Sequence, residues 1–196
     1  MDLYFRVETM NTPLSGNHRE IISSVKSWLE RAVIGLNLCP FARAVHVRGQ
    51  IRYTVTTATE PDQLVETLTE ELNYLHGCDP TVTDTTLLIH PWVLEDFSDY
   101  NEFLDVADVI LAGMGYEGEI QIASFHPDYQ FSGTQRDDVS NFTNRSPYPI
   151  LHLLREDSID RAVASVPDTA AIYKRNMATL RELGKDGWNS LFSKNE

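Results

Sequence analysis

Between residues 51 and 125, short strand-like segments alternate with longer helix-like segments, and this order restricts the fold more than any other feature. Three segments have strand character, namely residues 51–57, 85–90 and 120–125. Two segments with helical apolar spacing separate them, namely residues 59–77 and 99–112. Strands that alternate with helices form crossover units, which lay successive strands parallel in one sheet. We therefore expect an α/β (or α+β) fold.

The flanking segments extend this pattern. We predict a helix from His18 to about Leu36, a fourth strand at residues 150–154, and two further helices around residues 158–166 and 168–183. Residues 1–17 show no sustained period, so they are predicted to form an N-terminal arm before a single globular domain of residues 18–196. The expected architecture is a small mixed sheet of about four strands packed with about five helices.

The charge balance bears on the class of partner. The chain has 16 Lys and Arg against 29 Asp and Glu, which gives a net charge of −13. Such a chain repels phosphate backbones and anionic lipids, so nucleic acid and membrane partners are disfavoured. The first ten residues contain no signal-peptide core, and no apolar run approaches the length of a membrane span. These observations predict a cytoplasmic protein.

Residues 126–148 form a long segment with neither helical nor strand period. Loops of this length inside a compact domain are usually functional or disordered, and disordered segments are poor in aromatic residues. This segment contains Tyr129, Phe131, Phe142 and Tyr148. We therefore predict an ordered loop that covers a binding site.

Two histidines stand where strands end. His90 closes the second strand and His126 follows the third, and each is followed by proline. The carboxyl ends of parallel strands meet at one edge of a sheet, where ligands bind in open α/β folds. If the fourth strand returns antiparallel, Arg145 and Tyr148 start from the same edge. The sequence thus predicts one pocket shared by His90, His126 and Arg145.

The residue types suggest roles in that pocket. His126 is the candidate general acid or base because the usual pKa of histidine lies near neutral pH, with His90 and Asp128 as orienting or catalytic partners. The predicted substrate-binding residues are Arg145, Arg136, Asn144, Tyr129 and Tyr148. The two arginines could hold a carboxylate or phosphate. For each residue the alternative is structural: a histidine that bonds loop carbonyls, an arginine that braces the loop, or an ordinary turn former.

Three functions remain open from these residues. The first is an enzyme that acts on a small anionic metabolite by hydrolysis or proton transfer at a site under residues 126–148. The second is a noncatalytic metabolite-binding or protein-binding module. The third is a zinc or iron protein that uses Cys39, His90, His126 and Asp128, although no close ligand pair supports a metal. The cofactor and the oligomeric state are left open.

Other residues are interpreted as structural. His152 alternates with Ile150 and Leu154, which is typical of a core histidine with a hydrogen-bond partner. Arg155 and Glu156 are interpreted as a structural ion pair. Cys39 follows a helix carboxyl end, where the dipole disfavours a thiolate, so we expect an inert thiol.

Three segments resemble a known family. They are WLERAVIGLNLCPFA from Trp28, IHPW from Ile89, and SFHPDYQFSGT through NRSPYPILHLLRE to Glu156. The chain is similar over about residues 20–184 to an uncharacterised bacterial family, the domain of unknown function numbered fourteen-fifteen. The resemblance implies a single-domain, soluble bacterial protein and carries no activity, cofactor or catalytic residue.

Overall fold

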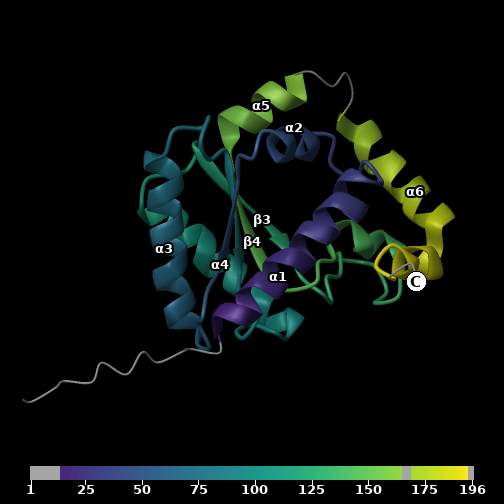
Figure 1. The fold of residues 1–196 in the computed structure, drawn as a ribbon, viewed down its shortest axis with the longest axis horizontal. Helices are drawn as coiled ribbons and strands as arrows, with labels where there is room; N and C mark the ends of the chain where they lie inside the picture. The colour runs from purple at the N-terminus through teal and green to yellow at the C-terminus, as the bar shows by residue number, and fades with distance from the viewer. Residues whose placement is uncertain (1–13, 165–168, 194–196) are drawn as a thin grey trace, which may run out of the picture.

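In the computed structural model, which describes residues 14–164 and 169–193, four strands form one mixed sheet (Figure 1). The strands are β1 (Ile51–Val55), β2 (Thr85–Ile89), β3 (Ile120–Phe125) and β4 (Ile150–Arg155). The α-helices are α1 (Leu14–Trp28), α2 (Ala42–Val47), α3 (Pro61–Gly77), α4 (Phe97–Gly113), α5 (Glu156–Ala164) and α6 (Thr169–Ser190). A π-helical segment, η1 (Leu29–Ile34), continues α1, and a 3₁₀ helix, η2 (Val139–Asn144), lies in the long loop. The predicted α/β class is confirmed.

The sheet order is β1-β2-β4-β3. β1 and β2 pair in parallel, and β4 pairs antiparallel with both β2 and β3. The carboxyl ends of β1, β2 and β3 therefore lie at one edge, as the sequence predicts. β4 lies between β2 and β3, a strand order that the sequence alone left open.

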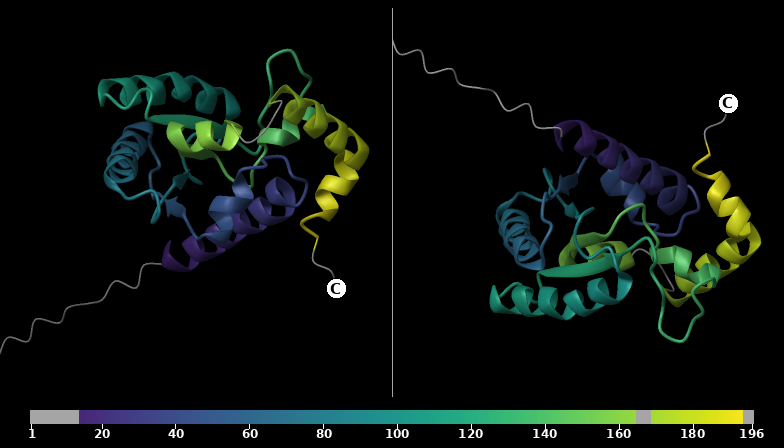
Figure 2. Two further views of the ribbon diagram at one scale, coloured as in Figure 1. Left: turned by 90° about the horizontal axis from the view of Figure 1, so that it is seen from above. Right: turned by 90° about the horizontal axis from the view of Figure 1, so that it is seen from below.

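Helices cover both faces of the sheet. Figure 2 shows α1 and α4 on opposite sides of it. Successive side chains of a strand point to opposite faces of the sheet, so the core has two parts. Leu88, Leu151 and Leu153 pack with α3 and α4 on one face. Leu87 and Ile150 pack with α1 and η1 on the other face. All five are at most 3% exposed.

Helix starts differ from the predictions by a few residues, since capping side chains set them. α3 begins after Glu60, which forms a capping box with Gln63, and not after Thr59. α4 begins after Asp96, whose carboxylate accepts a hydrogen bond from the Ser98 N–H, and not after Asp99. The cap of α3 thus lies slightly later in the chain than predicted, whereas the earlier cap of α4 lengthens that helix by almost a turn.

The amino-terminal part of the chain differs from the prediction in two ways. Residues 1–13 of the predicted arm lie outside the described residues, but α1 already begins at Leu14 within that arm. α2 also forms in what was predicted to be a connector. Among the described residues, none of the helices has the length and apolar character needed to span a bilayer.

Candidate functional site

His90 and His126 both pack against Tyr100 of α4. The His90 ring is stacked on Tyr100 at 5.7 Å between centroids, and the His126 ring lies 5.0 Å from Tyr100. The Tyr100 hydroxyl donates to the Ile150 carbonyl at 2.8 Å and accepts from the Phe125 N–H at 3.1 Å. Both histidines are 0% exposed. The edge of the sheet does bring the two predicted histidines together, but inside a packed aromatic cluster.

Hydrogen bonds to the backbone occupy these imidazoles. His126 Nδ1 accepts from the Asp128 N–H at 3.0 Å, so Nε2 carries the proton and donates to the Leu94 carbonyl at 3.3 Å. His90 Nδ1 lies 3.0 Å from the Val93 carbonyl, and its Nε2 is buried without a partner among the described residues. Burial lowers the pKa of His126, and it lowers the pKa of His90 to about 4. This geometry leaves His126 no free nitrogen for proton transfer.

The arginines predicted to bind substrate make contacts within the loop of residues 126–148. Arg145 donates from Nε to the Tyr129 carbonyl at 3.3 Å and from one terminal nitrogen to the Arg136 carbonyl at 2.6 Å. The Arg136 guanidinium is paired with Asp128 at 2.9 Å at the exposed surface. These contacts hold the two halves of the loop together.

The other predicted binding residues also make local contacts. Asn144 Nδ2 donates to the Ser124 carbonyl at 3.0 Å, and the Tyr129 hydroxyl accepts from Ser124 at 3.4 Å. Tyr148 packs against the core on the α1 side. Their roles toward a substrate stay predictions.

The expectation of one shared pocket is wrong. Arg145 lines a cavity of about 760 Å³ between α1, the loop and the end of α6, whereas His90 and His126 do not line it. The rings of Tyr100 and Phe97 pack against the imidazoles, and both histidines are fully buried.

A second cavity, the sheet cavity, lies on the α1 side of the sheet. Its volume is about 770 Å³. β1, β2, β3 and β4 form its floor, α1, η1 and α2 one wall, and α5 one end. Its apolar lining includes Trp28, Leu29, Val33, Phe41, Val45, Leu87, Ala123, Phe125, Leu154 and Ile159. Neither histidine of the aromatic cluster lines it.

His152 lies at the centre of this floor. In the sheet register it stands between Leu87 of β2 and Ala123 of β3. Its Nε2 lies 2.7 Å from Thr85 Oγ1, which in turn lies 2.7 Å from the Leu153 carbonyl. Burial lowers the pKa of His152 to about 4, so the ring is neutral at physiological pH. The predicted hydrogen-bond partner exists, although one face of His152 meets a cavity.

Charged and polar residues gather at the α5 end of the sheet cavity. Arg161 donates to Ser158 Oγ at 2.9 Å, and Ser158 donates to Asp84 at 2.6 Å. Arg48 is exposed beyond the end of α2. Cys39 lines the wall opposite, and burial raises the pKa of its thiol.

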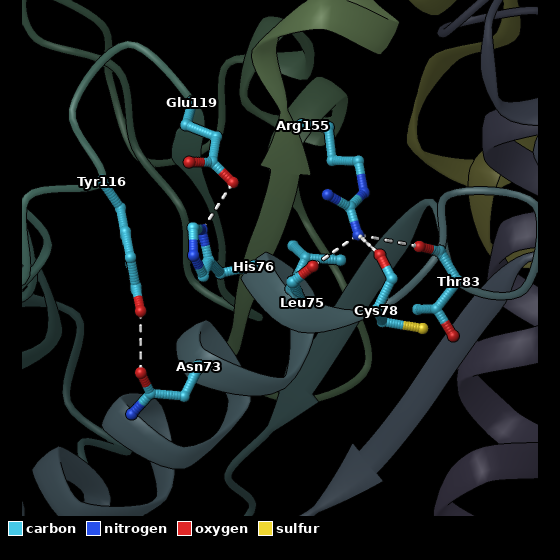
Figure 3. A network of polar contacts seen from close by, with 8 residues as sticks. All are labelled: Asn73, Leu75, His76, Cys78, Thr83, Tyr116, Glu119 and Arg155. Carbon is cyan, nitrogen blue, oxygen red and sulfur yellow. Dashed lines mark hydrogen bonds and ion pairs between the residues drawn. The ribbon is translucent and has the colours of Figure 1, made fainter.

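Arg155 is the last residue of β4 and lies next to the carboxyl end of α3. Figure 3 shows its guanidinium directed at the carbonyls of Leu75, Cys78 and Thr83, with the Cys78 contact at 2.6 Å. The predicted ion pair with Glu156 is wrong. Arg155 instead satisfies orphan carbonyls at the end of α3, where the helix dipole favours a cation.

The residues of the metal alternative are distributed over separate places. Cys39 lines the sheet cavity, while His90 and His126 lie in the aromatic cluster and Asp128 pairs with Arg136. Within residues 14–164 and 169–193, no three His, Cys, Asp or Glu side chains are grouped as metal ligands would be.

The sheet cavity was not predicted from the sequence. A polar His152 within the apolar run Ile150–Arg155 was a usable signal, because an inward polar side chain needs a partner or a ligand. The partner, Thr85, is 67 residues away and becomes visible only through the register of β2 and β4.

Comparison with known sequences gives a family but no activity. No curated protein and no solved structure matches the chain significantly. The profile of a family described as "Protein of unknown function (DUF1415)" matches residues 20–190, which is most of the chain. The matched region includes the whole sheet, the long loop and the lining of the sheet cavity. The chain therefore belongs to the DUF1415 family.

Proposed function

We propose that this protein binds a small molecule with a largely apolar body in the sheet cavity. The observation that carries the proposal is a cavity of about 770 Å³ with an apolar lining and a neutral histidine at the centre of its floor. Ligand sites typically have volumes of roughly 300–1,000 Å³, with apolar walls and a few polar groups that orient the ligand. The cavity meets each of these criteria.

The chemistry of His152 supports recognition over proton transfer. An efficient general base has a pKa near the working pH, and burial holds the pKa of His152 at about 4. The same reasoning applies to His90, while the nitrogens of His126 are engaged by the backbone. The enzyme expected under residues 126–148 thus stays a prediction, and a noncatalytic binding protein agrees better with this arrangement.

The charged residues that line the sheet cavity favour a ligand with an anionic group at one end. Among the described lining residues, Arg48, Arg155 and Arg161 outnumber the single carboxylate, Asp84, in a chain whose net charge is −13. Arg155 is engaged by backbone carbonyls, so Arg48 and Arg161 are the cations available at the surface. A local cation excess on an acidic protein is how an anion would be attracted.

The test uses a fluorescent apolar probe, N-phenyl-1-naphthylamine, and a variant that fills the cavity. Ala123→Leu places a larger side chain on the floor beside His152 and should abolish probe binding. Ala112→Leu, at an exposed position of α4, is the matched control and should bind normally. At a probe concentration of roughly 100 times the dissociation constant, the wild-type melting temperature should rise by about 5–10 °C.

The decisive comparison is between the two variants. Equal binding of the probe by wild type, Ala123→Leu and Ala112→Leu would place the probe elsewhere on the molecule. Together with a failure of wild type to bind any member of a metabolite panel, that result would overturn the proposed function.

A further inference from the structure

We infer that Thr85 fixes His152 as a hydrogen-bond acceptor, so that the sheet cavity selects ligands that carry a hydroxyl or N–H group on an apolar body. This inference rests on the proposed binding function and adds the chemical class of the ligand. It assigns His152 as the residue that determines specificity and Thr85 as the positioning residue behind it.

The direction of two hydrogen bonds establishes the state of the imidazole. Thr85 Oγ1 has one hydrogen and lies 2.7 Å from both His152 Nε2 and the Leu153 carbonyl. A carbonyl only accepts, so the hydroxyl must donate to Leu153. Its lone pair then accepts from His152, which requires the proton to be on Nε2. Because the neutral ring carries one proton, Nδ1 is left as a bare acceptor.

No group within residues 14–164 and 169–193 satisfies this acceptor. Among the residues that the structure describes, none donates to His152 Nδ1, and this atom is not one of the polar atoms sealed in the core. The neighbours of His152 in the sheet are Leu87 and Ala123, and the Phe125 ring lies 6.0 Å from the imidazole. A ligand that fills the apolar cavity and displaces water must therefore provide the donor, or it leaves the acceptor unpaired.

Thr85 determines that His152 accepts a hydrogen bond from the ligand and does not donate one. A histidine free to exchange tautomers could donate to an ether or carbonyl as readily as it accepts from an alcohol. The buried Thr85, 4% exposed, prevents this exchange because its own hydrogen is committed to Leu153. A ligand with only an acceptor at this place would set two lone pairs against each other.

The experiment compares two probes of nearly equal shape. N-phenyl-1-naphthylamine has an N–H donor between its rings, and 1-phenoxynaphthalene has an ether oxygen at the same place. The wild-type protein should bind the amine about tenfold more tightly than the ether, as expected when one neutral hydrogen bond is gained and a mismatch avoided. Fluorescence titration with the amine and displacement by the ether give both dissociation constants.

Three variants separate positioning from packing. Thr85→Val removes the fixed partner and should reduce the preference for the amine to less than about threefold while both probes still bind. Thr85→Ser keeps the hydroxyl and should restore the tenfold preference. His152→Phe removes the acceptor at nearly constant volume and should abolish the preference. A preference that persists in Thr85→Val or in His152→Phe overturns the inference.

A measurement on the wild-type protein does not depend on how the variants fold. The ¹⁵N resonances of the His152 ring report which nitrogen is protonated, and they should show hydrogen on Nε2 and a bare Nδ1 that shifts when the amine is added. The opposite tautomer overturns the inference. Equal affinity for amine and ether also overturns it but leaves the proposed binding function intact, whereas absence of binding by both probes and by every member of the metabolite panel removes the binding function itself.

Discussion

Replacing His90 should make the protein less sensitive to acid. His90 is 0% exposed, stacked on Tyr100, and bonded through Nδ1 to the Val93 carbonyl. The substitution His90→Asn keeps an N–H donor close to the position of Nδ1 and removes the titrating ring. Since the Nε2 of His90 has no partner among the described residues, the variant breaks no second hydrogen bond.

The sign of the effect follows from the pKa of His90, which burial lowers from 6.5 to about 4, with a smaller contribution from nearby His126. The unfolded chain binds the proton at a higher pH than the folded chain does. The contribution of His90 to stability is thus complete above about pH 6.5 and is lost as the pH falls toward 4. The loss amounts to about 2 kcal/mol at pH 5 and about 3 kcal/mol once the pH lies below both pKa values.

Urea denaturation followed by tryptophan fluorescence at several pH values measures this loss. Between pH 7.5 and 5, the unfolding free energy of wild type should fall by about 2 kcal/mol more than that of His90→Asn. Packing defects in the variant lower its stability at every pH and cancel in this comparison. Parallel curves for the two proteins would refute the assignment of His90 as a buried neutral group.

Three further perturbations test other parts of the structure. Arg155→Met removes the contacts to the end of α3 and should lower the unfolding free energy by about 3 kcal/mol in urea denaturation, and a change below about 0.5 kcal/mol would contradict its capping role. Asn141→Ala removes the side chain that accepts from Phe131 and Thr134, and amide hydrogen exchange of residues 131–135 should become faster while that of the strands is unchanged. In a Cys78→Ser background, saturating N-phenyl-1-naphthylamine should slow alkylation of Cys39 by about tenfold, and an unchanged rate would show that the probe does not occupy the sheet cavity.

Local pattern predicted the elements of this fold because each element leaves its own trace in the sequence. The alternation of residues 51–57 and the apolar spacing of α3 and α4 identify a strand and two helices without knowledge of any partner. The common edge of His90 and His126 followed from strand direction alone, and the structure confirms it.

Pairing and cavity formation could not be predicted in the same way. The local sequence of β4 does not show whether this strand pairs with β3 alone or lies between β2 and β3. The link between His152 and Thr85 depends on that insertion, since it joins residues of strands that meet only in the folded sheet. The loop of residues 126–148 is rich in polar and aromatic side chains, and this composition predicted a site there. The strand sequences that line the sheet cavity carry no comparable local signal.

The insertion of β4 also governs the order in which the molecule can be completed during synthesis. β1 and β2 can join as soon as α3 connects them. Among the described strands, β3 pairs only with β4, and it leaves the ribosome some thirty residues ahead of β4. Until Arg155 has emerged, the edges of β2 and β3 that pair with β4 have unpaired backbone groups, and β3 has no strand to dock on. The last strand to be made is the one that joins the two halves, so the nascent chain is most vulnerable to aggregation just before its centre is filled.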